Sequence, residues 1–337
     1  MQATDFDYDL PAGSIAQEAI EPRDGSRLLL TNPLEDRLFI DLPDILASGD
    51  LLVVNRTKVR AARLIGERLP GRGRTEVLLT QRVDPQRWRA LLRPAAKLKA
   101  GSVVECGSIT VTLLTDPDEG VATVSLDAKG DVEVAIATAG QVPLPPYFHG
   151  TISDPSRYQT IFATRVGSAA APTAALHFTE RVMAGLAARG VEVAEVELEV
   201  GLDTFRPMHD GNVEDHRIHT ERIVVPQAAV EAVAATRDRG GRVVAVGTTV
   251  VRTLESAAGG DGRIGGFDGP TSLFIMPGYE PQVVDAMITN FHAPRTTLLV
   301  LLAALMGDTW RDAYQHALDS GYRFLSFGDA MYLEIER

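Results

Sequence analysis

The segment ITNFHAPRTTLLVLLAALMG, residues 288–307, places an amide, an imidazole and a guanidinium directly before an apolar run. Asn290, His292 and Arg295 have the side chains to orient a ligand, move a proton or bind an anion. Residues 298–306 are too few to cross a bilayer, which takes roughly 20 apolar residues, so they predict a buried helix. The polar loop then lies at a helix N-terminus, where anions and catalytic groups are often bound. The alternative is a capped helix that begins in a solvated polar segment.

A second candidate is the strand–turn–helix pattern RVVAVGTTVVRTLES, residues 242–256. It sets Gly247 and the two following threonines at a helix N-terminus beyond the carboxyl end of a strand, where open α/β sheets bind carboxylates and phosphates. Arg252, one turn further, could hold an anion through two hydrogen bonds. The alternative is that Thr248 caps the helix and Arg252 pairs with Glu255. Neither a Walker loop nor G-x-G-x-x-G follows a strand, so P-loop and Rossmann sites are not indicated.

A run of small residues precedes His177 in GSAAAPTAALHFTERV, residues 167–182. Such a run lets the backbone approach a flat ligand closely, or it packs tightly against a core. His177 itself could act as a base or cap the helix that follows.

The segment EDHRIHTERI, residues 214–223, contains His216, His219 and Glu221. The spacing is not one of the strong zinc patterns, so a metal site is less favoured than an acid–base or polar-contact role. His219 and Glu221 would share one face if the segment is a strand.

The charge of the chain is unevenly distributed. The net charge is −12, yet residues 56–99 hold 13 Lys/Arg and 3 Asp/Glu, a local charge of +10, which leaves −22 for the remainder. A basic segment on an acidic protein is expected of a surface that binds a polyanion. The alternative is a strand-rich segment with solvated arginines.

Two regions differ in pattern. Residues 61–141 contain short, regularly spaced β-type runs without helices, separated by turn formers, and predict a small antiparallel barrel or sandwich. Elsewhere helical and strand patterns alternate, which predicts an α/β body: strands at 50–55, 191–201 (with one wet face) and 242–247, helices at 178–190, 226–241 and 248–258, and a flexible loop at 260–269. We therefore expect an α/β domain of residues 1–58 plus 142–337, a mixed sheet flanked by helices, with a β-barrel-like domain of residues 59–141 inserted into it.

Composition limits the remaining classes. The single cysteine, Cys106, excludes an internal disulfide framework and cysteine-based zinc or iron–sulfur sites. The first residues, MQATDFDYDLPAG, are acidic and contain no apolar segment typical of a signal peptide. With no membrane-spanning run, these features predict a cytoplasmic protein without membrane partners.

Taken together, the motifs closely resemble one family. The chain is similar to S-adenosylmethionine:tRNA ribosyltransferase-isomerases of the queuosine pathway from Asp5 to about Tyr332. The matching segments, in order, are DFDYDLP, IAQ, RDGSRLL, GDLLVVNRTKVRAARL, RPAAKLKAG, VPLPPY, RYQTIFA, AAPTAALHFTE, VGLDTFRPM, VGTTVVRTLES, FIMPGY, ITNFHAPRTTLL and YRFLSFGDAM.

The resemblance implies a reaction that consumes S-adenosylmethionine. Its ribosyl part goes to 7-aminomethyl-7-deazaguanine at the wobble position of a tRNA, adenine and methionine leave, and the sugar becomes an epoxycyclopentanediol. Neither a metal nor another cofactor is expected, and the protein is expected to be a monomer. A base that removes a proton beside the sulfonium, and general acid–base groups active near neutrality, are required.

The resemblance also suggests roles for individual residues. The candidates for acid–base work are His177, His219, Glu221 and His292, without a ranking among them. The candidates for binding S-adenosylmethionine are Pro172, Thr173, Gly247, Thr248, Thr249, Arg252 and Asn290, with Asn290 and Thr173 on ribose hydroxyls and Arg252 with the 247–249 turn on the methionine carboxylate. The candidates for tRNA are Arg60, Arg63, Arg93, Lys97 and Lys99 on phosphates, and Tyr147 or Phe148 stacked on bases.

Several positions depart from the family pattern. Arg56 stands where an aspartate is usual, and Ala175 and Asp203 stand where glycines are usual. IHTERI and Phe148-His149 differ as well. A paralogue with another acceptor, a non-catalytic RNA-binding protein of the same fold, and a methyltransferase or nucleosidase that acts without RNA therefore remain alternatives.

Overall fold

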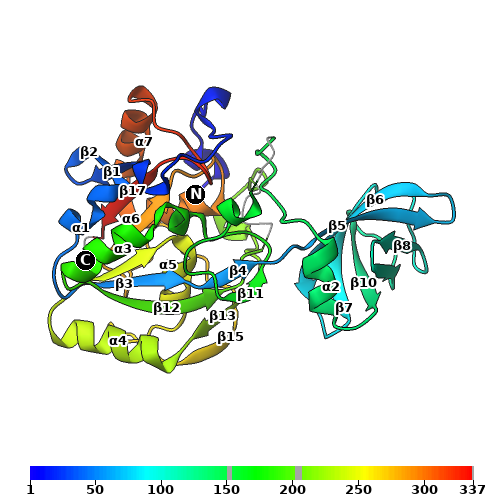
Figure 1. Cartoon of the computed structure of the whole chain (residues 1–337). Coiled ribbons are helices and arrows are strands. Elements are labelled where there is room, and N and C mark those ends of the chain that lie inside the picture. The colour runs from blue at the N-terminus through cyan, green and yellow to red at the C-terminus, as the bar shows by residue number, and fades with distance from the viewer. Residues whose placement is uncertain (150–153, 202–206, 336–337) are drawn as a thin grey trace. The chain divides into compact units, whose positions relative to one another are not determined.

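The computed structural model describes residues 1–149, 154–201 and 207–335 (Figure 1). Contacts between Cα atoms divide the chain into two compact units. The first comprises Met1–Lys58, Pro145–Arg165 and Ala171–Arg337, and the second Val59–Leu144 and Val166–Ala170. Each unit has its own hydrophobic core. A short two-stranded sheet is formed by β4 (Thr57–Val59) and β11 (Arg165–Ser168).

The first unit is built on a mixed sheet with nine strands in the described part of the chain, in the order β15-β13-β12-β3-β14-β16-β17-β1-β2. β12, β3, β14 and β16 run parallel to one another, and β17 runs antiparallel to β16. The strands are β1 (Arg27–Thr31), β2 (Leu34–Leu38), β3 (Leu51–Asn55), β12 (Glu192–Leu198), β13 (Glu221–Val225), β14 (Val243–Val246), β15 (Phe267–Thr271), β16 (Ala286–Asn290) and β17 (Ala330–Glu334).

Both faces of the central sheet are buried, which explains why its strands are continuous apolar runs. In β3, Leu51 and Val53 belong to one core cluster, and Leu52 and Val54 belong to the other. The first cluster includes residues of α4 (Gln227–Asp238), α5 (Thr248–Ser256), α6 (Thr297–Met306) and α7 (Thr309–Asp319), and the second includes residues of α1 (Leu42–Ile45) and α3 (Glu180–Ala188).

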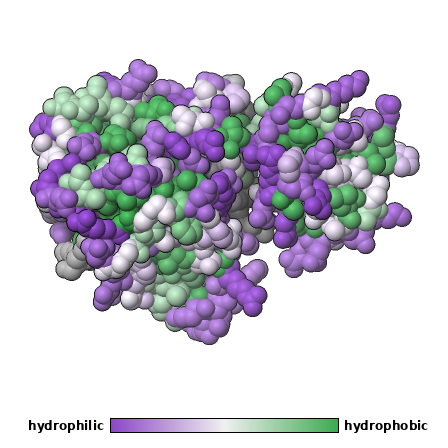
Figure 2. Space-filling view, turned by 90° about the horizontal axis from the view of Figure 1, so that it is seen from below, coloured by the Kyte–Doolittle hydropathy of each residue, from purple (hydrophilic) through white to green (hydrophobic). Residues whose placement is uncertain are grey.

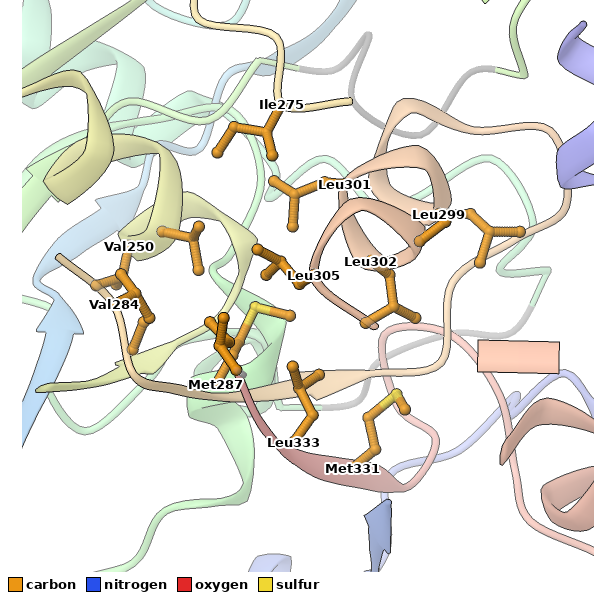
Figure 3. Packing of buried hydrophobic residues seen from close by; sticks show 14 of the residues in the cluster. Val250, Ile275, Val284, Met287, Leu299, Leu301, Leu302, Leu305, Met331 and Leu333 are labelled. Atoms are coloured by element: carbon orange, nitrogen blue, oxygen red, sulfur yellow. The ribbon is translucent and has the colours of Figure 1, made fainter. Parts of the chain in front are cut away.

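The apolar run is α6, as predicted. Asn290, expected in the polar loop, is instead the last residue of β16, and the loop comprises residues 291–296. Figure 3 shows leucines of α6 packed with Met287 of β16 and with Met331 and Leu333 of β17. The side chain of Thr296 caps the helix by accepting a hydrogen bond from the backbone N–H of Leu299. The hydrophobic helix therefore fixes the loop before it to the end of the sheet.

Most predicted elements of this unit are confirmed, including α3, α4, α5, β3, β12 and β14. Thr179 is the N-cap of α3. Two details were wrong. Residues 267–269, expected in a flexible loop, belong to β15, which pairs with β13. The wet face predicted for β12 is only partly wet, because Glu197 is buried against Arg56.

The second unit is a closed antiparallel barrel in the order β10-β7-β6-β5-β8-β9. Its strands alternate buried and less buried residues, so the buried set fills the interior. The strands are β5 (Arg63–Leu69), β6 (Gly73–Arg82), β7 (Arg87–Arg93), β8 (Val103–Cys106), β9 (Ile109–Leu113) and β10 (Val121–Ala128). The mixed sheet and the barrel confirm the fold class predicted from the sequence.

The expectation of a second region without helices was wrong. Residues Val132–Ala139 form α2, and the Asp131 side chain caps it by accepting a hydrogen bond from the Val134 N–H at 3.0 Å. Ala135 and Ile136 join the barrel core. Packing against the barrel thus decides the structure of a sequence rich in β-branched residues.

No helix within the described ranges is long and apolar enough to cross a membrane. On the face of the molecule that Figure 2 shows, hydrophilic residues separate small hydrophobic areas.

Candidate active site

The main cavity of the first unit lies where several strand ends meet. β14 and β16 are parallel neighbours, so Gly247 and Asn290 end their strands at the same edge of the sheet. Because β17 is antiparallel to β16, the segment that precedes it reaches this edge as well. The cavity has a volume of about 620 Å³ and is lined by Tyr147, Ala171, Pro172, Thr173, Ala174, Val200, Gly247, Thr248, Thr249, Thr289, Asn290, Phe291, His292, Ala293, Thr296, Leu298, Leu325 and Ser326.

The start of α5 presents unused hydrogen-bonding groups to the cavity. Gly247 has φ of +87°, and an added Cβ would lie 3.4 Å from the Cβ of Ala174, so glycine suits this turn. Gly247, not Thr248, is the N-cap, and no side chain caps the helix. The N–H groups of Thr248 and Thr249, the first two of the helix, have no acceptor within it, whereas the N–H of Val250 donates to the carbonyl of Gly247 at 3.1 Å. The buried Thr249 Oγ1 has no hydrogen-bond partner among the described residues.

Asn290 connects the cavity to the interior. Its Oδ1 accepts a hydrogen bond from Thr173 Oγ1 at 3.0 Å. Its Nδ2 donates to His177 Nε2 at 3.0 Å and to the carbonyl of Asp329 at 3.3 Å. Since a carbonyl oxygen can only accept, the contact with Asp329 fixes the orientation of the amide.

His177 lies behind Asn290 and does not line the main cavity. Because its Nε2 accepts a hydrogen bond, the ring proton is on Nδ1, which donates to Ser26 Oγ at 2.8 Å. The ring stacks on Phe39 with centroids 5.0 Å apart. Burial lowers the pKa of His177 to about 4. The imidazole is therefore neutral near pH 7 and holds the amide of Asn290 in place.

His292, in contrast, lines the cavity. Its ring Nε2 lies 3.1 Å from Thr289 Oγ1. Its backbone N–H donates to Tyr314 Oη at 2.8 Å, and its backbone carbonyl accepts from Tyr8 Oη at 2.6 Å. Burial lowers the pKa of His292 to about 3. A neutral imidazole thus forms part of the wall.

Arg252 and Glu221 form a buried ion pair that does not line the cavity. Arg252 Nε also donates to the carbonyl of Leu273 at 3.1 Å, and Glu221 Oε1 accepts from the N–H of Gly201 at 2.9 Å. The Arg252–Glu255 pair considered from the sequence is wrong. Glu255 instead accepts hydrogen bonds from the N–H groups of residues 282–284 and from the hydroxyl at 279.

His219 is exposed, precedes β13 and does not line the cavity. Tyr147, expected to stack on a base, lines the cavity and hydrogen-bonds to Ser326 Oγ. Burial raises the pKa of Tyr147 to about 12. Ser326 and Leu325, which also line the cavity, were not predicted, because nothing in the segment YRFLSFGDAM marks them as ligand contacts. Leu325 has a left-handed φ of +69°, a conformation that is uncommon for leucine.

The basic residues of the barrel separate into two groups. Arg60 Nε pairs with Glu133 at 3.1 Å and its guanidinium lies 4.7 Å from the centre of the Trp88 ring, while Arg63 pairs with Glu76 at 2.8 Å. Arg93, Lys97 and Lys99 are exposed and form no ion pair with any described residue. The second group is therefore available to a polyanion.

The structure accounts for two departures from the family pattern. Arg56 Nη2 lies 2.7 Å from Glu197, and Arg56 Nη1 lies 3.4 Å from Glu195, so the basic residue has acidic partners. Ala175 is fully buried beside Phe178 in a core cluster. Asp203 lies outside the described residues.

Acid is expected to destabilise the protein through its two buried histidines. The unfolded chain binds protons at about pH 6.5, whereas the folded pKa values are about 4 for His177 and about 3 for His292. This stabilisation is complete above pH 6.5 and is lost as the pH falls toward the folded values. Between pH 7 and pH 5, we expect the free energy of unfolding to fall by about 2 kcal/mol per histidine.

Urea titrations at the two pH values measure this loss. His177→Gln should remove its share of the pH dependence, and His149→Gln, on an exposed side chain, is the matched control. If the free energy of unfolding falls equally between pH 7 and pH 5 in the wild type and in His177→Gln, the expectation is contradicted.

The chain is similar to known proteins over nearly its whole length. A family model described as queuosine biosynthesis protein matches residues 3–333. The S-adenosylmethionine:tRNA ribosyltransferase-isomerase of Symbiobacterium thermophilum is 46% identical, covering 98% of this chain and 99% of the relative. The enzyme of the same name from Anaeromyxobacter sp. (strain Fw109-5) is 48% identical, covering 99% of each. The crystal structure of an S-adenosylmethionine tRNA ribosyltransferase from Thermotoga maritima matches with a TM-score of 0.56 and 36% identity, covering 97% of this chain and 99% of that one.

Proposed function

The chain belongs to the family of queuosine biosynthesis proteins, and from this membership we propose that it is an S-adenosylmethionine:tRNA ribosyltransferase-isomerase. It transfers and isomerises the ribosyl part of S-adenosylmethionine onto 7-aminomethyl-7-deazaguanine at the wobble position of a tRNA. Epoxyqueuosine-tRNA, adenine and methionine are the products. We place the reaction in the cytoplasm, where a tRNA substrate is available, and in a monomer.

The single observation that carries the proposal for the site is the main cavity at the ends of β14 and β16. It brings the polar groups of Thr173, Thr249 and Asn290, which come from three separate segments of the chain, to one place. We place the methionine carboxylate at the start of α5, where the first N–H groups and the Thr249 hydroxyl are free to donate. Pro172 and Gly247 shape the adjoining wall.

The ribose hydroxyls belong at Asn290 and Thr173. Both N–H donors of the Asn290 amide are occupied. Its Oδ1 accepts one hydrogen bond, from Thr173, and therefore retains one lone pair for a ligand hydroxyl. Thr173 Oγ1 donates to Asn290 and keeps its own lone pairs as acceptors. Two acceptors side by side suit the two hydroxyls of a ribose.

For the proton beside the sulfonium, we favour His292 as the base. It is the candidate imidazole that lines the cavity, and its neutral ring can accept a proton. Because burial lowers its pKa to about 3, it is a weak base, so the acidity of the C–H beside the sulfonium must supply much of the driving force for the transfer. The sulfonium acidifies the adjacent C5′–H, and removal of that proton gives an ylide that expels adenine. His177 acts as a positioning residue through Asn290. Glu221 is bonded to Arg252 away from the cavity, so we assign it no part in the proton transfer.

Thr249→Val is expected to weaken binding of S-adenosylmethionine about tenfold without loss of stability. Valine keeps the shape, and it removes a buried hydroxyl that has no partner in the described structure. Calorimetric titration and urea unfolding measure the two quantities. Thr253→Val is the matched control, because Thr253 Oγ1 donates to the Thr249 carbonyl at 2.8 Å and does not line the cavity. An unchanged affinity in Thr249→Val would remove this residue from the site.

The barrel residues Arg93, Lys97 and Lys99 are proposed to bind tRNA phosphates. Changing all three to glutamine should weaken tRNA binding and lower the slope of log affinity against log salt by about 2 to 3. Lys129→Gln removes an exposed cation of the same unit outside the basic segment and should leave the slope nearly unchanged. A wild-type slope in the triple variant would exclude these contacts.

The activity itself is tested by adenine and methionine release from S-adenosylmethionine, with and without tRNA that carries the aminomethyl-deazaguanine. Release that requires this tRNA supports the transferase. Binding of tRNA without release would instead support a non-catalytic RNA-binding protein. Release with free nucleobase alone would support an enzyme that acts without RNA.

A further inference from the structure

A second, smaller cavity adjoins the proposed active site within the first unit. It has a volume of about 270 Å³, and its lining includes Arg23, Arg157, His177 and Ser326. Ser326 lines both cavities. His177, on the wall of the smaller cavity, is hydrogen-bonded to Asn290, on the wall of the larger one. The two cavities therefore share Ser326 and are linked by the hydrogen bond between His177 and Asn290.

The two arginines are held in place mainly by neutral groups. Arg23 donates to the carbonyl of Gln159 at 2.7 Å and to that of Ser156 at 2.9 Å. Arg157 donates to the carbonyl of Ile20 at 3.0 Å. Backbone carbonyls orient a guanidinium without cancelling its charge, so both side chains are fixed with their positive charge largely retained.

A single carboxylate pairs directly with the two arginines in the described chain. Arg157 Nε lies 2.8 Å from Glu21, which is 67% exposed and so offers a weak, solvent-screened partner. Burial is the main cause that lowers the pKa of Arg23, and the neighbouring Arg157 lowers it further, while Glu21 and Asp154 act in the opposite direction. The two guanidinium groups are thus near enough to repel each other. An anion between them would relieve this repulsion.

We propose that this smaller cavity binds a phosphodiester of the tRNA next to the nucleotide being modified, with Arg23 and Arg157 as its ligands. The inference rests on the proposed function, because that reaction brings a nucleotide of the tRNA beside S-adenosylmethionine. Guanidinium groups match the oxygens of a phosphate in pairs. The other anionic group of the reaction, the methionine carboxylate, is proposed above to bind at the start of α5, in the larger cavity.

The test compares tRNA binding by full-length variants at several salt concentrations. Arg157→Gln is expected to weaken binding about tenfold. It should also lower the slope of log affinity against log salt by about 0.7, as loss of one single-strand phosphate contact predicts. Glu21→Gln removes the competing carboxylate and should tighten binding. Arg189→Gln, which removes the same charge from an exposed ion pair with Asp44, is the control and should change little.

Binding of S-adenosylmethionine without tRNA is measured in the same variants and is expected to be unchanged. Weaker binding in Arg157→Gln would overturn the proposal, since the cavity would then hold the carboxylate. Wild-type tRNA affinity and salt slope in Arg157→Gln would overturn it as well.

Arg157→Lys keeps the charge and should recover part of the tRNA affinity, which a merely structural role would not predict. If Lys and Gln lower the affinity equally, the proposal fails. The proposed function is tested separately, by tRNA-dependent release of adenine in the wild-type protein. The comparison of variants measures binding alone and requires no turnover, so the two can fail independently.

Discussion

Replacing Asn290 by alanine is expected to lower tRNA-dependent adenine release by roughly 100- to 1,000-fold. The change removes the acceptor proposed for a ribose hydroxyl and leaves Thr173 Oγ1 without its partner at 3.0 Å. It also leaves His177 Nε2 without its donor. Misplacing the ribose misaligns the C5′–H with its base, so the loss should appear mainly in kcat.

Asn55→Ala is the matched control for this variant. Asn55 is likewise a fully buried asparagine that ends a strand of the same sheet, and its amide donates to the Leu198 carbonyl at 3.0 Å. It does not line the cavity. The two variants should lose similar stability in urea, while Asn55→Ala keeps most of its activity. Similar losses of activity in both would show that Asn290 acts through stability alone.

His177→Gln separates positioning from acid–base catalysis in the same network. Glutamine can accept the hydrogen bond from Asn290 but cannot act as an imidazole base. Loss of about tenfold, with an unchanged pH dependence of the rate, is expected of a positioning residue. A far larger loss, together with a changed pH dependence of the rate, would make His177 the base.

Much of the fold could be predicted because its signals are local. Continuous apolar runs such as residues 51–54 predicted strands, and the helical pattern of residues 178–190 predicted α3. Helix α2 was missed because Val132–Ala139 is rich in β-branched residues, and its helical structure depends on a single cap and on packing against the barrel. Tertiary contacts of this kind produce no periodic pattern in the sequence.

Part of the site was likewise predictable from local signals. Gly247 could be singled out because it follows a strand-like run, and Asn290 because it precedes an apolar helix, and the structure places both on one cavity. The partners of the charged and imidazole groups could not be found by local spacing. Arg252 pairs with a carboxylate 31 positions away, and His177 bonds to an amide 113 positions away. Burial, which makes the histidines neutral, is a property of the assembled sheet.

The largest effect on stability is expected from Arg252, which the sequence suggested as a ligand of the methionine carboxylate. Arg252→Met leaves the buried carboxylate of Glu221 without its counter-charge. We expect the free energy of unfolding to fall by about 3–5 kcal/mol. Urea unfolding near pH 7 measures the change, with calorimetric titration of S-adenosylmethionine alongside it.

The double variant Glu221→Met/Arg252→Met distinguishes a structural pair from a ligand-binding one. Removing both charges eliminates the buried carboxylate that lacks the Arg252 counter-charge, so the double variant should be more stable than Arg252→Met alone. Recovery will be incomplete, because the Gly201 N–H and the Leu273 carbonyl lose their partners. If Arg252→Met instead keeps its stability and loses affinity for S-adenosylmethionine, the guanidinium binds the substrate directly, and the ion pair with Glu221 only orients it. The structural reading predicts the opposite pattern, because the guanidinium is already committed to Glu221 and does not line the cavity.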